Sequence, residues 1–200
     1  MKLLVGVSGA SGSAYAVALL REAVRLGCDV HAVFSRWGAE VLRLECGLDP
    51  EDFPDVDLHD PDEMSAPPAS GSTLYDGMVI LPCSMHTLAC TAHGMSFNLL
   101  QRAAGVMLKE KRTLVLVPRE TPLSVVHLEN MLTLARAGAL ILPASPAFYH
   151  KPRDLNALVN QVAGKVLNAL GLQQDLFPAW SAPEGRSRAG AGGGREKPAG

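Results

Sequence analysis

The chain alternates short apolar runs with longer amphipathic stretches. Five short runs predict strands: Leu3–Val7, Val30–Phe34, Met78–Leu81, Thr113–Val117 and Leu140–Leu142. The stretches between them predict helices: about Ser13–Leu26, Trp37–Leu44, Ser84–Leu108 with a break near Gly94, Ser124–Ala137 and Leu155–Leu170. Because the strands are continuously apolar rather than alternating, we expect both faces of the sheet to be covered. This order predicts one α/β domain with an open, doubly wound, mostly parallel sheet.

Two segments depart from this alternation of strands and helices. The segment 50–72 carries seven acidic residues and five prolines, which indicates a long surface excursion before the third predicted strand, and that strand is expected to end at Pro82. The segment 181–200 has no Val, Ile, Leu, Met or aromatic residue, and eight of its twenty residues are Gly or Pro. It cannot contribute to a core, so we expect a domain over 1–180 and a disordered tail over 181–200.

Composition narrows the functional classes. The chain has 200 residues, 48% of them hydrophobic, and a net charge of −2 from 18 basic and 20 acidic side chains. This balance gives no basic surface for general nucleic-acid binding. The four cysteines show no metal-type or disulfide-type spacing, which favours buried, reduced thiols. The first apolar run is too short for a secretion signal, and no run approaches a membrane span, so we expect a cytoplasmic protein.

Small and hydroxyl-bearing residues follow the predicted strands. Gly6-Val7-Ser8-Gly9-Ala10-Ser11-Gly12 closes the first strand, Ser35 follows the second, and Ser84-Met85-His86-Thr87 follows the third. In open α/β sheets such as Rossmann-like and flavodoxin-like domains, ligands bind at these strand ends, where helix N-termini also point. The pattern predicts a site for a nucleotide or flavin phosphate.

The residues by themselves also allow other interpretations of these motifs. The three glycines are three apart, unlike the dinucleotide fingerprint, and such a turn can be purely structural. Gly6-Val7-Ser8-Gly9-Ala10 nearly matches the nucleophile elbow of serine hydrolases but lacks its second glycine. Arg119-Glu120 suits either a surface ion pair at a helix start or a phosphate-binding arginine beside a proton-transferring carboxylate. Lys165, Tyr149 and Trp180 are individually compatible with ordinary packing.

Taken together, these segments resemble the UbiX/Pad flavin prenyltransferases, a branch of the flavoproteins that also include FMN-dependent cysteine decarboxylases. The resemblance spans nearly all of 1–180, and its motifs are Gly6–Gly12, Ser84–Thr87, Asn98–Arg112, Leu114–Met131 and Pro143–Tyr149. The combination of RETPL, HL-x-NM and PA-x-PAFY is specific.

The resemblance implies that the chain joins the dimethylallyl group of dimethylallyl phosphate to reduced FMN, at N5 and then C6. The prenylated FMN would serve a UbiD-type decarboxylase, in ubiquinone biosynthesis or aromatic acid metabolism. By analogy, FMN would be held by Gly9, Ala10, Ser11, Ser35, Ser84, Met85, His86, Thr87 and Arg102. The prenyl phosphate would be surrounded, partly across a subunit interface, by Lys109, Arg119, Glu120, Tyr149 and Lys165. Catalytic positions would be Glu120, Ser11, Trp180 and Glu45.

This chemistry explains the residue types. An allylic phosphate ionises where cations and hydrogen-bond donors meet the leaving phosphate. A developing allyl cation needs a water-poor, electron-rich surface, for which Trp180 is suited. Proton removal needs a relay, for which Glu120 or the released phosphate is suited. No Asp-rich metal motif is present, and this leaving-group activation needs no metal.

Three positions depart from the family pattern. His86 stands where a small or basic residue is expected, Lys165 where arginine is frequent, and Gly105 where aspartate is common. The alternatives are an FMN-dependent cysteine decarboxylase and a non-catalytic FMN carrier for an aromatic acid decarboxylase. The decarboxylase branch carries a P-A-S-A-N-type motif where this chain has Pro82–Thr87. Family members form trimer-based homo-dodecamers, so the resemblance implies a large homo-oligomer.

Overall fold

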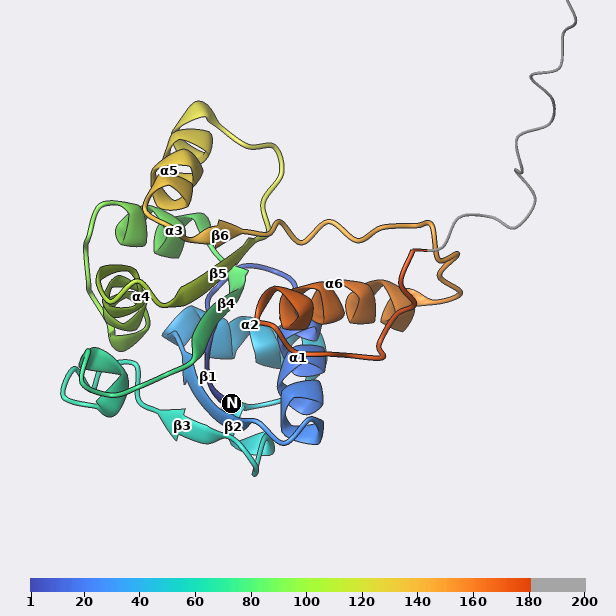
Figure 1. Ribbon diagram of the computed structural model, residues 1–200, viewed down its shortest axis with the longest axis horizontal. Helices are drawn as coiled ribbons and strands as arrows, with labels where there is room; N and C mark the ends of the chain where they lie inside the picture. The colour runs from blue at the N-terminus through green and yellow to red at the C-terminus, as the bar shows by residue number, and fades with distance from the viewer. Residues whose placement is uncertain (181–200) are drawn as a thin grey trace, which may run out of the picture.

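The computed structural model describes residues 1–180 of the chain, so the predicted tail 181–200 lies outside the described residues. These residues form one parallel, six-stranded open sheet in the order β3-β2-β1-β4-β5-β6 (Figure 1). The strands are β1 (Lys2–Val7), β2 (Asp29–Phe34), β3 (Asp57–His59), β4 (Gly77–Cys83), β5 (Thr113–Pro118) and β6 (Leu140–Ile141). This order confirms the doubly wound fold expected from the sequence.

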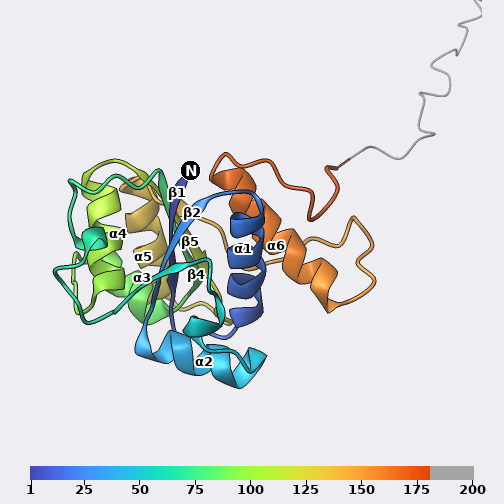
Figure 2. The same cartoon turned by 90° about the horizontal axis from the view of Figure 1, so that it is seen from below.

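Helices cover both faces of the sheet, as the continuously apolar strands predict. One face carries α1 (Ser13–Arg25), α2 (Arg36–Cys46) and α6 (Leu155–Ala169). The other carries α3 (Met85–Ala92), α4 (Leu99–Lys109) and α5 (Val125–Arg136), and Figure 2 shows the two helical layers on either side of the strands. No helix within residues 1–180 is long and apolar enough to cross a membrane.

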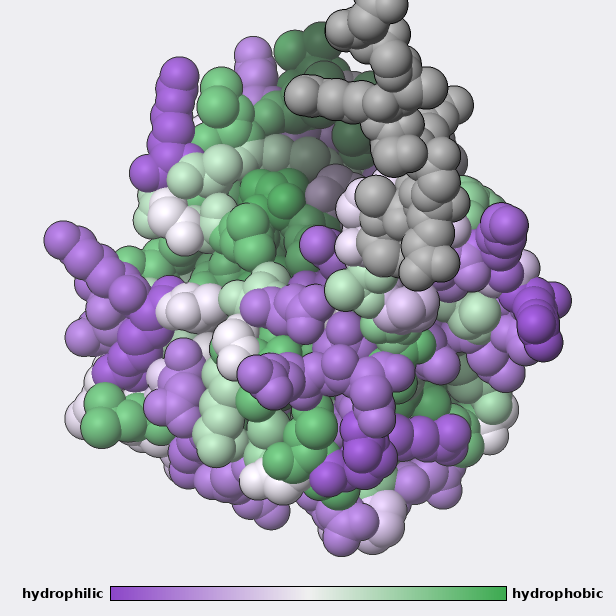
Figure 3. Space-filling view, turned by 45° about the vertical axis from the view of Figure 1, so that its right-hand side comes forward, coloured by the Kyte–Doolittle hydropathy of each residue, from purple (hydrophilic) through white to green (hydrophobic). Residues whose placement is uncertain are grey.

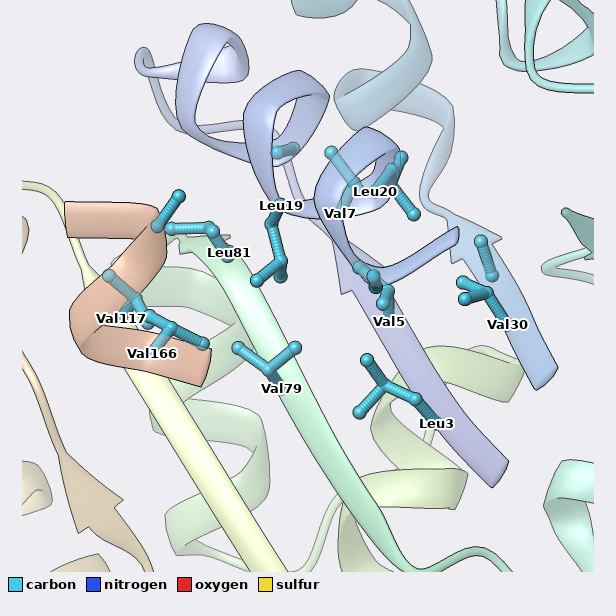
Figure 4. Packing of buried hydrophobic residues seen from close by; sticks show 14 of the residues in the cluster. Leu3, Val5, Val7, Leu19, Leu20, Val30, Val79, Leu81, Val117 and Val166 are labelled. Atoms are coloured by element: carbon cyan, nitrogen blue, oxygen red, sulfur yellow. The ribbon is translucent and has the colours of Figure 1, made fainter. Parts of the chain in front are cut away.

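Strand alternation divides the core into two clusters. Leu3, Val5 and Val7 of β1 point toward α1 and α6, where they pack with residues such as Leu19 and Val166 (Figure 4). The intervening β1 side chain, Leu4, belongs to the cluster on the α4 side. Each such side chain, once fully buried, contributes about 1.5–3 kcal/mol relative to exposure. Both clusters therefore hold β1 and β4 at the centre of the domain.

The structure corrects two boundaries. The 50–72 excursion contains a sixth strand, β3, whose three residues pair in parallel with β2 and were too few and too polar to predict. The third predicted strand, β4, runs through Pro82 to Cys83 instead of ending at the proline. Its ladder shifts register between Ile80 and Cys83, which accommodates a residue without an N–H donor. The break predicted near Gly94 is confirmed, since that residue has φ 68° between α3 and α4.

Polar residues cap most of the helices. The side chains of Ser35, Ser84, Asn98, Ser124 and Asp154 accept a hydrogen bond from the first turn of α2, α3, α4, α5 and α6 respectively. Helix α1 differs, because its N-cap is Gly12, with φ 118° and no side chain to cap the helix. The four cysteines are free; Cys83 and Cys90 are buried, whereas Cys28 and Cys46 are partly accessible.

Two glycines predict opposite responses to alanine. A Cβ at Gly38 would lie 2.2 Å from the Val7 carbonyl oxygen, so Gly38→Ala forces α2 away from β1 and should lower the free energy of unfolding by about 1–3 kcal/mol. A Cβ at Gly105 in α4 would meet no atom within 4 Å, so Gly105→Ala should raise the free energy of unfolding by about 0.5–1 kcal/mol. Chemical denaturation followed by circular dichroism measures both. Equal effects of the two substitutions would contradict this packing.

Candidate functional site

The carboxyl ends of β1 and β4 form the centre of the site. These strands are neighbours, but α1 and α3, which follow them, lie on opposite faces of the sheet. Such a divergence opens a crevice in which ligands of doubly wound sheets bind. A pocket of about 260 Å³ occupies it, lined by Gly9, Ser35, Arg36, Trp37, Ser84, His86, Thr87, Asn98 and Gln101. Five of the predicted flavin-binding residues thus line one pocket: Gly9, Ser35, Ser84, His86 and Thr87.

Three helices begin at this pocket. Ser35 Oγ accepts from Gly38 N at 3.0 Å, Ser84 Oγ from Thr87 N at 3.2 Å, and Asn98 Oδ1 from Gln101 N at 3.0 Å. These bonds fix the first turns of α2, α3 and α4 and leave the remaining N–H groups of each turn for a ligand. Converging helix N-termini favour negative charge, so the pocket suits a phosphate group.

Gly9 and Trp37 form one wall of the pocket. A Cβ on Gly9 would lie 2.4 Å from the Trp37 Cβ, so only glycine allows the loop after β1 to pass this close to α2. The Trp37 side chain stays 69% exposed, an unusual state for so large an apolar group. Its indole therefore offers a flat surface beside the pocket to a ring-shaped ligand.

Ser8 is structural, which removes the serine hydrolase interpretation. It is 1% exposed, and its Oγ donates to the Pro82 carbonyl at 2.9 Å and accepts from Ser84 N at 2.7 Å. A nucleophilic hydroxyl must be accessible and must face a base. The Ser8 hydroxyl instead joins the loops after β1 and β4 across the crevice.

Ser11, Glu45 and Arg119 meet at the start of α1. Glu45 Oε2 accepts from Gly12 N at 2.9 Å and from Ser13 N at 2.8 Å, so a carboxylate of α2 caps the helix that lacks its own cap. Partial burial favours a higher pKa for Glu45, but hydrogen bonds from Ser11, Gly12 and Ser13 outweigh it and lower the pKa. Arg119 Nε donates to the Ser11 carbonyl at 3.0 Å. The loop after β1 is thus fixed from both sides.

A second pocket lies beyond β6. It measures about 400 Å³ and is lined by Leu142, Pro143, Ser145, Ala147, Tyr149, Gln161, Val162 and Lys165. Trp180 contacts Tyr149 edge to face, with ring centres 5.4 Å apart and ring planes at 90°. Glu120 is exposed, and its carboxylate accepts from Thr121 N at 2.9 Å. Because β5 lies between β4 and β6, Arg119 and Glu120 stand between the two pockets.

Besides Ser11, Glu45, Arg119, Glu120 and Trp180, four further predicted residues line neither pocket. Ala10, within the loop after β1, is buried. The side chain of Met85 is half-buried and packs against the core on the α4 side. Arg102 donates from Nε to the Ala69 carbonyl at 3.0 Å. Lys109, the last residue of α4, pairs with Glu110 near the start of β5, at the opposite end of the sheet from Arg119.

Sequence reasoning missed four residues that line the first pocket: Arg36, Trp37, Asn98 and Gln101. Two features of the sequence could have identified three of them. Arg36 and Trp37 directly follow the predicted phosphate residue Ser35, and Asn98 is a preferred N-cap residue directly before an apolar pair. Gln101 carried no such signal, since its pocket position depends on how α4 is rotated about its axis.

Comparison with known proteins finds close relatives in both sequence and structure. The Flavoprotein family model matches residues 1–167. Flavin prenyltransferase UbiX of Alkalihalophilus pseudofirmus is 48% identical over 190 residues, which cover 89% of this chain and 95% of that protein. A crystal structure of AnUbiX (PadA1) in complex with FMN and dimethylallyl pyrophosphate has a TM-score of 0.89 and 40% identity, and the match covers 90% of this chain and 97% of that one.

Two further solved structures resemble the chain to different degrees. A dodecameric FMN-dependent UbiX-like decarboxylase from Escherichia coli O157:H7 has a TM-score of 0.88 and 42% identity, over 91% of this chain and 100% of that one. The FMN-dependent cysteine decarboxylase TvaF shares the fold alone, with a TM-score of 0.61 and 14% identity over 86% of this chain and 98% of that one. The chain belongs to the UbiX flavin prenyltransferases of the Flavoprotein family.

Proposed function

We propose that this flavin prenyltransferase transfers the dimethylallyl group of dimethylallyl phosphate to reduced FMN. The observation that carries the proposal is the order of sites along one edge of the sheet. A pocket built from helix N-termini lies at β1, β2 and β4, a second pocket with Lys165 and Tyr149 lies beyond β6, and Arg119 stands between them. The AnUbiX relative, whose structure contains FMN and dimethylallyl pyrophosphate, supports two adjacent ligands of this kind.

The first pocket fits FMN. The N-termini of α2, α3 and α4 suit its phosphate, and the close approach at Gly9 leaves room for a ligand beside the Trp37 indole. Reduced FMN, when bound, would supply the electron-rich N5 and C6 atoms that accept the prenyl carbon. His86 and Thr87 on the first turn of α3 would contact the flavin from the other wall.

The leaving phosphate would be stabilised by Arg119, Lys165 and Tyr149. Breaking the allylic C–O bond leaves its electron pair on the phosphate, so cations and O–H donors around that group lower the barrier. Arg119 uses Nε for the Ser11 carbonyl, which leaves its two terminal nitrogens to donate to a phosphate. Trp180 packs against Tyr149 and would help to exclude water from the developing allyl cation.

Glu120 would take the proton that C6 loses when the second bond, the carbon–carbon bond to C6, forms. Its carboxylate is exposed and bonded only through the neighbouring Thr121 N–H in the described residues, so it is free to accept a proton. Glu45 would act differently, as a positioning residue. Its two backbone hydrogen bonds hold Ser11 at the start of α1, beside Arg119.

Lys109 and Arg102 would be supplied by a second copy of the chain. Lys109 lies at the wrong end of its own sheet to reach Arg119. Large apolar side chains are exposed at Leu123, Val125, Val126, Leu128, Leu132 and Phe148. Figure 3 shows a hydrophobic hollow on the upper part of the molecule, which carries α5 and the segments after β5 and β6. Apolar surface of this kind marks protein interfaces, and the related Escherichia coli protein is dodecameric.

The product would be prenylated FMN, handed to a UbiD-type decarboxylase in the cytoplasm. The four free cysteines agree with a reducing compartment. Because the decarboxylase is a separate protein, the modified flavin must leave this enzyme. Both pockets lie at the carboxyl edge of the sheet, so the product could leave from that edge.

Anaerobic incubation with FMN, dithionite and dimethylallyl phosphate tests the reaction directly. Mass spectrometry of the released flavin should show the addition of one C5 prenyl unit that depends on the protein. A parallel reaction with dimethylallyl pyrophosphate tests the choice of donor. Unmodified FMN that co-purifies with the protein in both reactions would contradict prenyl transfer and leave FMN carriage as the function.

Substitution Glu120→Gln separates chemistry from binding. It removes the proton acceptor but keeps the shape, so FMN affinity should stay unchanged while turnover falls about 10²–10⁴-fold. Fluorescence titration measures the affinity, and the flavin mass assay measures the turnover. Glu51→Gln, at an exposed carboxylate of the 50–72 excursion, is the matched control and should leave both values unchanged. Equal turnover of the two variants would remove Glu120 from the proposed mechanism.

Mixed oligomers test whether the site is shared. Lys109→Ala and Arg119→Ala should each be nearly inactive alone, because each lacks one cation at the leaving phosphate. When the two variants are unfolded and refolded together, random assortment across a subunit interface should restore about one quarter of the sites. Activity assays on the mixture would detect this recovery. A mixture as inactive as its components would show that Lys109 does not act across an interface.

A further inference from the structure

A cluster of acidic and histidine side chains lies away from both pockets, on strands β2 and β3. Asp29 and His31 come from β2, and Asp57 and His59 come from β3. The parallel register places His31 beside Asp57, so these side chains emerge on the same face near the start of the two strands. The flavin pocket lies at the opposite end of β2, after Phe34.

His31 is the buried member of this cluster. The residue is 8% exposed, and its Nε2 has no hydrogen-bond partner within the described part of the chain. That nitrogen nevertheless lies 3.3 Å from Asp29 Oδ1 and 3.7 Å from Asp57 Oδ2. A buried, unpartnered polar atom is costly, so this nitrogen, facing two carboxylates, indicates a ligand that binds all three groups.

The spacing of these atoms suits a metal ion. Donor atoms bound to one tetrahedral zinc at about 2.0–2.2 Å lie roughly 3.3–3.6 Å from one another. One ligand atom from each of Asp29, His31 and Asp57 falls within 4.8 Å of the other two. The two carboxylates are largely exposed, at 56% and 72%, so their side chains can rotate toward each other to close the remaining gap and admit the ion from solvent.

We propose that Asp29, His31 and Asp57 form a site for a divalent transition metal ion, with Zn²⁺ the best fit. An imidazole with two carboxylates is a nitrogen and oxygen donor set that zinc accepts, whereas Mg²⁺ and Ca²⁺ prefer oxygen alone. The site is separate from prenyl transfer and rests on none of the residues assigned to that reaction. Its role is to join the edge strand β3 to β2.

His59 orients the proposed ligand. Its Nε2 lies 3.0 Å from His31 Nδ1, and the two rings stack with planes 10° apart. When His59 accepts from His31 Nδ1–H, the lone pair of His31 is placed on Nε2, toward the carboxylates. Metal-binding histidines are held by outer partners in this way.

Tyr75 and Lys2 complete the surroundings. The Tyr75 ring meets His31 edge to face with centres 5.3 Å apart, which fixes the imidazole plane. The Tyr75 hydroxyl is buried and has no hydrogen-bond partner within the described residues, so it is available as a donor beside the cluster. Lys2 Nζ lies 3.9 Å from Asp29 Oδ2 and pairs with the oxygen that the metal does not use.

Calorimetric titration of the untagged, FMN-loaded protein with ZnCl₂ tests the site. We expect one zinc per chain and a rise in the unfolding temperature. Asp57→Asn should weaken binding more than about 100-fold, beyond the loss typical of an outer partner, and His59→Gln about 10–100-fold. Asp55→Asn, an equal charge change at an exposed carboxylate two residues away, is the matched control and should bind zinc like the natural chain.

Two results would overturn the proposal. One is the absence of zinc binding at one ion per chain. The other is equal binding by Asp57→Asn and Asp55→Asn, which would place the zinc elsewhere. Because the Asp57 side chain is 72% exposed, its substitution leaves the core intact, and unchanged FMN affinity verifies the fold.

Discussion

The site depends on one constraint, the divergence of α1 and α3 from adjacent central strands. β1 and β4 pair side by side, yet the chain leaves β1 toward one face and β4 toward the other. Right-handed crossovers produce this divergence wherever strand order runs outward in both directions from the centre. The Ser8 hydroxyl spans the resulting gap, with one bond to Pro82 and one to Ser84. The crevice therefore keeps a fixed width at its floor while its rim stays open to ligands.

Attraction of anions at this edge comes from two different sources. In the flavin pocket it comes from the N–H groups of helix N-termini, which need no mobile charged side chain. Toward β6, in the donor site that we propose, it would come from the side chains of Arg119 and Lys165, which could follow a phosphate as it leaves. A fixed cradle suits a ligand that must be oriented through two bond-forming steps. A movable cation suits the group that departs.

Most of the fold could be predicted from the sequence because the apolar runs that form the central strands are continuous. It failed at β3, where pairing with β2 rather than hydrophobicity makes the strand. At β4, a register shift overrides the usual stop at Pro82. Within the site, motif positions such as Ser35 and Ser84 could be predicted because they directly follow strands. Ser8 could not be told from a nucleophile by sequence, since only burial and its two hydrogen bonds distinguish the roles. Lys109, which we propose to act from another copy, shows a further limit, because a single chain places such a residue beside none of its functional partners.

The two ends of the sheet face different physical problems. At the carboxyl end, unpaired helix N-termini and the crevice create binding potential. At the amino end, a three-residue edge strand must be kept in place although it buries little apolar surface. Arg102 and Arg112 hold the segment that follows β3 by bonding to the carbonyls of Ala69, Gly71 and Thr73. The Asp29–His31–Asp57 cluster acts on the strand itself. Since Arg102 uses only Nε for this contact within the described residues, its remaining N–H groups stay available to a phosphate from a neighbouring copy. In the shared site that we propose, Arg102 would thus both hold the segment after β3 and bind the phosphate.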